Sequence, residues 1–277
     1  MILLPPTGCL MQMPAIIKNP VHGMGKDTLF IIQELGRIAI FFLKGLFHIF
    51  SWPLQFRKLI EQLYFIGMKS VIVVSLTGAF TGMVLGFQGY YTLVKFGSEG
   101  LLGTLVSLTL IRELGPVLTA IMVTGRAGSA MAAELGIMRI SEQIDALETM
   151  DIDSIRFLYS PRLAAALISF PLLTALFDVI GIIGGYLTGC VLLGINSGLY
   201  FYRTEFSVQM QDVTGGFIKA LVFGAVVVTI CCFQGYYTHM RKEGFGAKGV
   251  GSATTSAVVI SCVLTLATDY VLTSFLM

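Results

Sequence analysis

The chain has 277 residues, and only 12% of them are charged, about half the ~25% that is usual for soluble domains. Hydrophobic residues make up 55% of the sequence, and 31 further residues are glycine. A soluble domain has no interior for so many apolar side chains, so most of them must face lipid. The composition excludes a disordered chain and a disulfide scaffold. A formal net charge of +2 also argues against a nucleic-acid-binding protein.

The chain begins with two segments that are less apolar than the rest. Residues 1–27 contain four prolines and no positive region before an apolar stretch, which predicts an irregular leader without a cleaved signal peptide. Residues 28–68 mix charged and apolar side chains and contain Trp52, which favours an amphipathic helix in the membrane interface. A sixth span at 29–50 is the alternative.

Five apolar windows between charged residues predict five transmembrane helices. Each is long enough for the ~20 residues that cross a ~30 Å hydrocarbon core. A span in lipid must be helical, because no water is there to satisfy its backbone. The predicted spans are 71–93, 103–125, 163–194, 217–238 and 251–275. The fold class is therefore an all-α integral membrane protein, with one unit over residues 28–277.

The distribution of lysine and arginine predicts the orientation in the membrane. Residues 1–69 carry seven such residues, the 126–162 connection carries four, and the 239–249 connection carries three. The connections on the other side carry Lys95 and Arg203. Since positive charges concentrate on the cytoplasmic side, the N-terminus is predicted to be cytoplasmic and the C-terminus to lie across the membrane.

Two spans carry glycine at every fourth position, a spacing that lets helices approach closely in lipid. The stripes are Gly78, Gly82 and Gly86 in the first span and Gly181, Gly185 and Gly189 in the third. They predict helix packing, either inside one subunit or across a dimer.

The connection at 126–162 is too long for a turn and too charged for lipid. A helix over about 131–150 is predicted there, because apolar residues recur at helical spacing at Ile137, Ile140, Ile144 and Leu147. The remaining surface is acidic and fits poorly against the negative cytoplasmic leaflet. Docking into a groove of a partner protein is therefore favoured over a solvated helix at the membrane.

Arg112 and Glu113 interrupt the second window near its middle. Charges inside a span are costly and usually face a cavity, a pathway or a partner. Neighbours in a helix point in different directions, so the two do not simply neutralise each other. Pro116 also frees the carbonyl of Arg112, four residues back. A functional role is favoured, and the alternative is a buried ion pair between helices, with Asp178 as one candidate partner.

The sequence lacks motifs for chemistry of its own. It contains no GxxxxGK[ST] phosphate loop and no HExxH, and its three histidines are scattered. We therefore predict no catalytic residue, no metal site and no bound cofactor.

Several motifs together carry a resemblance to a known family. They are LIRELGP at 110–116, GRAGSA at 125–130, EQIDALE at 142–148, GVGSATT at 249–255 and DYVLT at 269–273. The sequence closely resembles the MlaE family of permeases over about residues 28–276. These are membrane subunits of ABC transporters that move phospholipid between the membranes of diderm bacteria.

The resemblance implies partners and a location. It implies a homodimer in the bacterial inner membrane, with a role in outer-membrane lipid asymmetry. It implies a cytoplasmic ABC ATPase that uses ATP and Mg²⁺, a periplasmic MCE-domain lipid-binding protein and, in some members, a STAS-domain protein. The 131–150 segment would be the coupling helix. Its candidate contacts to the ATPase are Glu134, Arg139, Glu142, Gln143, Asp145 and Glu148.

A phospholipid carries an anionic phosphate and two apolar tails, so its path needs a few polar groups on an apolar wall. We predict that this path lies at the dimer axis between the first two spans. The candidate residues are Arg112, Glu113, Leu85, Gly89, Leu93 and Phe96. The alternative is a proton-coupled secondary transporter of a lipid or amphipathic substrate, working through Glu113, Asp178 and Asp269. A structural scaffold would leave Arg112 and Glu113 unexplained.

Overall fold

The structure is a computed structural model that describes residues 20–49, 55–240 and 246–276. All regular secondary structure in these ranges is helical. Helix α1 (Pro20–Ile49) begins inside the predicted irregular leader, so that prediction is wrong for residues 20–27. Proline suits the start of a helix, because the first backbone N–H groups have no partner there. Residues 1–19 and Trp52 lie outside the described ranges.

Five helical segments of the described chain are long and apolar enough to cross a membrane, which confirms the predicted number of spans. They are Phe56–Val94, Glu99–Ile140, Ile155–Leu192, Met210–Tyr236 and Gly246–Leu276. Four of them are far longer than the ~20 residues that a bilayer core requires, since a helix continues beyond the lipid once it has formed. Helix α1 is not among the five, and an interfacial position for 28–68 stays a prediction.

The remaining helices occur along the chain in the following order. The first segment consists of α2 (Phe56–Ile66), η1 (Met68–Ser70) and α3 (Val71–Val94). The second consists of η2 (Glu99–Leu101), α4 (Leu102–Thr109), η3 (Leu110–Leu114), α5 (Gly115–Val123), η4 (Thr124–Gly128) and α6 (Ser129–Ile140). After α7 (Gln143–Thr149) come η5 (Ile155–Tyr159), α8 (Ser160–Tyr186), η6 (Leu187–Leu192) and α9 (Ser197–Ser207). The last are α10 (Met210–Tyr236), η7 (Thr238–Met240) and α11 (Gly246–Leu276).

The chain divides into two compact units, one ending at Ile40 and the other beginning at Phe41. Within the second unit, the last turns of α1 pack on the start of α8. The ring of Phe41 lies 4.4 Å from that of Tyr159, and the hydroxyl of Ser160 donates to the carbonyl of Gly45 at 2.8 Å.

Helix α3 packs along α8, and the two glycine stripes meet there. A Cβ atom at Gly82 would overlap the carbonyl oxygen of Gly181, and one at Gly86 would come within 3.1 Å of that of Gly185. Gly189 instead faces α4. The stripes therefore pack inside one subunit, because glycine alone allows backbones to approach this closely.

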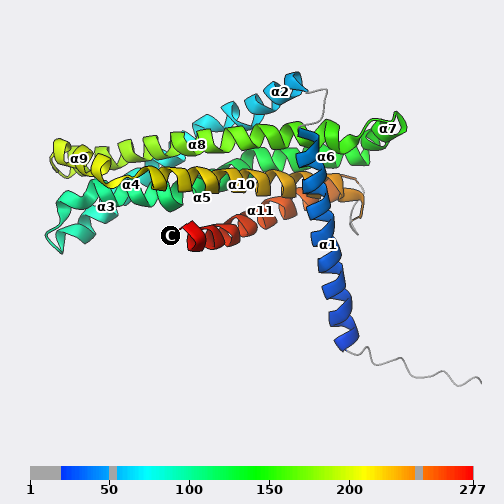
Figure 1. Cartoon of the computed structure of the whole chain (residues 1–277), viewed down its shortest axis with the longest axis horizontal. Coiled ribbons are helices and arrows are strands. Elements are labelled where there is room, and N and C mark those ends of the chain that lie inside the picture. Colours follow the sequence, from blue (N-terminus) through cyan, green and yellow to red (C-terminus); the bar gives the residue numbers. More distant parts are fainter. Residues whose placement is uncertain (1–19, 50–54, 241–245, 277) are drawn as a thin grey trace, which may run out of the picture. The chain divides into compact units, whose positions relative to one another are not determined.

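Helix α10 is the most enclosed span, with 67% of its apolar window buried against 22% for α11. It packs against α5, α6, α8 and α11, and it lies beside α8 along much of its length in Figure 1. A helix surrounded in this way can connect sites at its two ends.

The predicted single helix over 131–150 is wrong, because the structure divides it into α6 and α7. The chain turns at Glu142, whose φ of +58° lies in the left-handed region and cannot continue a right-handed helix. The predicted apolar stripe is divided as well. Ile144 is fully buried, whereas the side chain of Ile137 is 57% exposed.

Candidate functional site

The centre of the candidate site is an irregular turn in the second candidate span. In η3 the backbone N–H of Gly115 bonds to the carbonyl of Leu110, five residues back, which makes it a π turn. The next residue, Pro116, has no N–H to offer, so the carbonyl of Arg112 lacks its helical partner. The ammonium group of Lys219 on α10 donates to this carbonyl at 2.8 Å. The polar group that the sequence predicts to be free thus binds a lysine from another span.

Lys219 joins three spans through its ammonium group. The nitrogen lies 2.9 Å from Oε2 of Glu113, 2.7 Å from the hydroxyl of Thr273 and 3.0 Å from Oδ1 of Asp269. The side chain of Lys219 is only 4% exposed. The three hydrogens of the ammonium group are donated to the carbonyl of Arg112, the carboxylate of Glu113 and the hydroxyl of Thr273. Asp269 therefore interacts with Lys219 as an ion pair and not through a hydrogen bond. A buried ammonium is tolerated because it is paired in this way.

Arg112 is held by the first turn of α10. Its Nε and Nη2 both lie 2.8 Å from Oδ1 of Asp212. The other oxygen of Asp212 accepts the backbone N–H of Gln209 at 3.0 Å, which completes a capping box at the start of α10. The pair Arg112 and Glu113 therefore lies beside the first turns of α10 and the last turns of α11. Both residues lie in the second candidate span, and their depth in the membrane stays a prediction.

These charged groups surround a cavity of about 230 Å³. Its lining includes Arg112, Glu113, Gln209, Asp212, Lys219 and Thr273. The volume is below the ~300–1,000 Å³ of pockets that enclose a drug-sized ligand, so it fits a polar headgroup rather than a whole lipid. The side chain of Arg112 is 40% exposed and keeps donors that Asp212 does not use.

The predicted alternative of an ion pair between helices is present, because Glu113 pairs with the buried Lys219 and Arg112 pairs with Asp212. Asp178 as the partner is wrong, since both partners lie on α10. Asp178 lies on α8 against Gly115. Its Oδ1 is buried and has no hydrogen-bond partner among the residues that the structure describes. It lines a separate, mainly apolar cavity of about 180 Å³ together with Thr174.

The apolar residues predicted for the substrate path do not line the charged cavity. Gly89 is buried, and a Cβ atom there would come within 2.9 Å of Leu102. Its face of α3 therefore turns into the subunit at this point. Leu85 and Leu93 are half-buried, and the side chain of Phe96 is 77% exposed.

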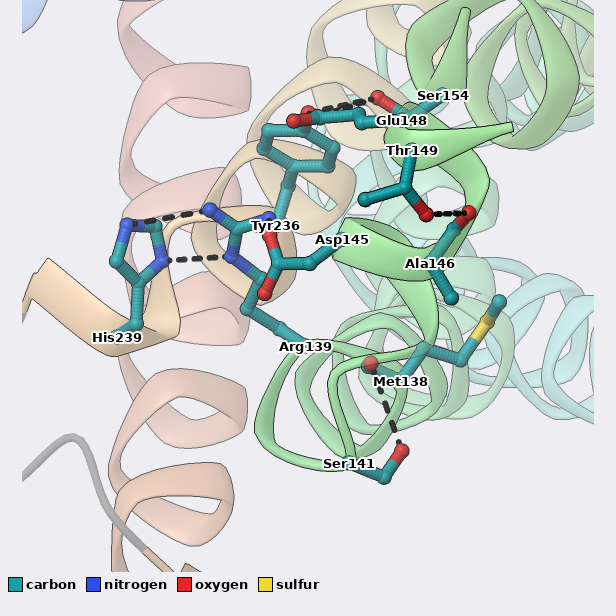
Figure 2. A network of polar contacts seen from close by, with 10 residues as sticks. All are labelled: Met138, Arg139, Ser141, Asp145, Ala146, Glu148, Thr149, Ser154, Tyr236 and His239. Atoms are coloured by element: carbon teal, nitrogen blue, oxygen red, sulfur yellow. Dashed lines mark hydrogen bonds and ion pairs between the residues drawn. The ribbon is translucent and has the colours of Figure 1, made fainter. Parts of the chain in front are cut away.

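Most of the predicted coupling residues bind other parts of the same chain, as Figure 2 shows for three of them. Arg139 lies 2.8 Å from Asp145, and Glu148 accepts the hydroxyl of Tyr236 at 3.0 Å. Outside the figure, Glu134 pairs at 2.9 Å with Arg162.

Two predicted coupling residues remain accessible. Glu142 and Gln143 are exposed, and their side chains make no hydrogen bond or ion pair with any described residue. They are the best placed of the six for contact with a partner.

His239, which lies in the connection after α10, binds the side chain of Arg139. Its Nδ1 accepts a hydrogen bond from Nε of Arg139 at 2.9 Å. Burial lowers the pKa of His239, and the neighbouring positive charge of Arg139 lowers it further. His239 is therefore neutral at pH 7 and can act as an acceptor.

Sequence reasoning missed Lys219, Asp212, Tyr236 and Arg162 as members of these networks. Each lies far from its partner in the sequence, and no local pattern pairs them. The only available signal was charge at the edge of an apolar window, which Lys219 and Arg162 both carry.

Comparisons with known proteins identify the family of this chain. The family model described as Permease MlaE matches residues 59–275. The chain belongs to the MlaE permease family. This membership confirms the resemblance that the sequence motifs carry.

Relatives in this family match nearly the whole chain. A probable ABC transporter permease protein of Rickettsia bellii is 45% identical over 93% of this chain and 98% of its own length. The intermembrane phospholipid transport system permease protein MlaE of Haemophilus influenzae is 39% identical over 94% of this chain and 98% of its own. The chloroplastic protein TRIGALACTOSYLDIACYLGLYCEROL 1 of Arabidopsis thaliana is 38% identical over 87% of this chain and 65% of its own.

Proposed function

We propose that this chain is the permease subunit of an ABC transporter that moves phospholipid between the inner and outer membranes of a diderm bacterium. The observation that carries the proposal is the similarity to the Haemophilus phospholipid transport permease over almost the full length of both chains. The sequence contains no phosphate-binding loop, so ATP and Mg²⁺ belong to a separate ATPase subunit.

The charged cavity is the proposed contact for the lipid headgroup. The free donors of Arg112 suit a phosphate, which arginine binds through charge-assisted and often bidentate hydrogen bonds. Glu113 braces the cavity, because its two oxygens contact Lys219 and Thr273. Neighbouring apolar surface would carry the tails along a path at the axis of a homodimer.

The proposed assembly follows the charge distribution along the chain. The N-terminus and the α7 region lie in the cytoplasm, where the exposed Glu142 and Gln143 contact the ATPase. The C-terminus lies in the periplasm, where an MCE-domain protein receives or delivers lipid. A STAS-domain protein joins the ATPase in some members of the family.

The test is transport by the purified permease with its co-purified ATPase in proteoliposomes. We expect phospholipid transfer that requires ATP hydrolysis and stops when the ATPase carries an inactivating substitution. Transfer that needs only a pH gradient and no ATPase would overturn the proposal. It would restore the proton-coupled alternative, which the family membership does not favour.

Arg112→Gln tests the headgroup site in the same assay. Loss of charge-assisted hydrogen bonds to a phosphate, worth about 1.5–3 kcal/mol, should slow transfer by about 10- to 100-fold. Arg57→Gln is the control, because Arg57 lies on the exposed face of α2 with a side chain that is 94% exposed. Equal transfer by both variants would remove Arg112 from the path.

A further inference from the structure

Tyr236, the last residue of α10, meets two other segments through its hydroxyl group. The hydroxyl lies 3.0 Å from Oε1 of Glu148 on α7 and 2.8 Å from the hydroxyl of Ser154, which precedes η5. The hydroxyl of Ser154 also lies 3.1 Å from the same carboxylate oxygen. Tyr236 is 7% exposed and Ser154 is 4% exposed, whereas Glu148 is exposed, and the three residues line a cavity of about 470 Å³. Hydrogen bonds to a carboxylate are stronger than those between neutral groups.

Arg139 makes a second connection beside the first, which Figure 2 shows. Its guanidinium group lies 5.4 Å from the centre of the Tyr236 ring, within the range of a cation–π interaction. It also pairs with Asp145 on α7 at 2.8 Å and donates to His239 on η7 at 2.9 Å. We call this set the α7 junction, with the members Arg139, Asp145, Glu148, Ser154, Tyr236 and His239.

The α7 junction and one buried side chain hold α7 in place. The helix has seven residues, and Ile144 is its one buried side chain. A helix this short is not stable by itself. Its position therefore depends on the burial of Ile144 and on the side-chain contacts to Arg139 and Tyr236.

Helix α10 leads from the α7 junction to the charged cavity. Tyr236 and Lys219 lie on the same helix, about 26 Å apart at a rise of 1.5 Å per residue. Lys219 holds Arg112 and Glu113 at the cavity, and Asp212 holds Arg112 from the first turn. Because α10 is a continuous helix enclosed by its neighbours, it provides a direct connection between Tyr236 and Lys219.

We propose that Tyr236 is the positioning residue through which movement of α7 passes into α10 and reaches the charged cavity. The proposal rests on the proposed function, in which an ATPase moves α7. It assigns to Glu148 and Tyr236 a role in converting ATP hydrolysis into lipid transfer, rather than in binding the ATPase or the lipid.

The test uses Tyr236→Phe in the complete complex with its ATPase in proteoliposomes. This variant keeps the aromatic ring against Arg139 and removes only the hydroxyl. We expect the ATPase to remain bound and to hydrolyse ATP at close to its normal rate. Phospholipid transferred per ATP hydrolysed should fall by about tenfold, the effect of losing one hydrogen bond to a charged group. An unchanged ratio would overturn the proposal.

Tyr159→Phe is the matched control. The hydroxyl of Tyr159 lies 2.6 Å from that of Thr229, which is also on α10, and both residues are buried. The control thus removes a buried tyrosine hydrogen bond to the same helix without touching α7. We expect its transfer ratio to match the wild type. An equal fall in both variants would show general loosening of α10 and would overturn the proposal.

Substitutions at Glu148 provide the second test. Glu148→Gln keeps an oxygen acceptor for Tyr236 and should retain the transfer ratio, whereas Glu148→Ala should lower it as Tyr236→Phe does. The double variant Glu148→Ala/Tyr236→Phe should fall no further than either single variant, because both remove one contact. A transfer ratio in the double variant that falls by the product of the two single effects would overturn the proposal. Loss of bound ATPase from Glu148→Ala alone would also overturn it.

The wild-type complex separates this proposal from the proposed function. If wild-type transfer does not depend on ATP, the proposed function fails before any variant is compared. If wild-type transfer depends on ATP and Tyr236→Phe transfers as much phospholipid per ATP hydrolysed as the wild type, only the role of Tyr236 is overturned.

Discussion

Single residues in this protein have fixed positions because buried polar groups need partners. Pro116 leaves one carbonyl without its helical N–H, and Lys219 supplies the replacement while binding two acidic groups. Further along the bundle, Arg162 is 3% exposed and pairs with Glu134. In both places, the position of the charged side chain is determined by the polar group that it binds, which lies on another helix.

Lys219→Met tests this dependence. The variant leaves two carboxylates and a carbonyl without their shared partner, and breaking a buried pair costs about 3–5 kcal/mol. We expect a clear drop in the thermal unfolding midpoint of the purified protein in detergent. Lys95→Met, at an exposed position with no ion pair among the described residues, is the control. Matching midpoints for the two variants would contradict the assignment.

His239 makes the α7 junction sensitive to pH. Its pKa is lowered in the folded protein, so its contribution to stability is present above the ordinary value of about 6.5. That contribution is lost as the pH falls from this value through the lower pKa of the folded protein, because a protonated ring cannot accept from Arg139. We expect hydrogen exchange in residues 143–150 to become faster between pH 7 and pH 5.5.

The control for this prediction is His239→Gln, which should remove the pH dependence of exchange. A second histidine, His48, lies 3.5 Å from Asp153 in the same region. The comparison is therefore made in a His48→Gln background. An equal rise in exchange with and without His239 would contradict the prediction.

At the scale of helices, close backbone approach decides which elements pair. Helices α3 and α8 pack where glycines remove the Cβ atoms between their backbones. Helices α6 and α7 separate where Glu142 adopts a positive φ. Both effects act on the backbone, so neither can be relieved by the movement of a side chain.

Gly82→Ala tests the helix contact. The added methyl group would overlap the carbonyl of Gly181, and overpacking of this kind costs about 1–3 kcal/mol. We expect a lower thermal unfolding midpoint than in the wild type. Gly251→Ala is the control, because nothing lies within 4 Å of the added atom and alanine favours a helix. A wild-type midpoint for Gly82→Ala would mean that the contact is looser than described.

For the whole molecule, the question is how the short α7 segment at one end of α10 communicates with the charged cavity near the other end. Helix α10 provides a direct connection, since Tyr236 and Lys219 lie on it and contact the two regions. Only part of the α7 region is free for a partner, because Asp145 and Glu148 already bind the chain itself. Glu142 and Gln143 are free of such contacts in the described chain.

Glu142→Lys/Gln143→Lys should therefore release the ATPase without unfolding the permease. Charge reversal at the rim of an interface weakens association. The fold should be unaffected, because neither side chain makes a hydrogen bond or ion pair with a described residue. The measurement is co-purification of the ATPase together with the thermal unfolding midpoint. Glu205→Lys, on the exposed surface of α9, is the control. Full retention of the ATPase by the double variant would move the docking site elsewhere.

The sequence by itself determined the number of spans and the family, and it also predicted the free carbonyl beside Pro116. These features are local, because hydropathy is a property of one window and the missing N–H is a property of one residue. Only the tertiary structure decided that Lys219 takes that carbonyl, that Tyr236 binds Glu148 and that the chain turns at Glu142. Such contacts depend on how helices far apart in the sequence align, and lipid-facing helices of similar hydropathy could align in many ways.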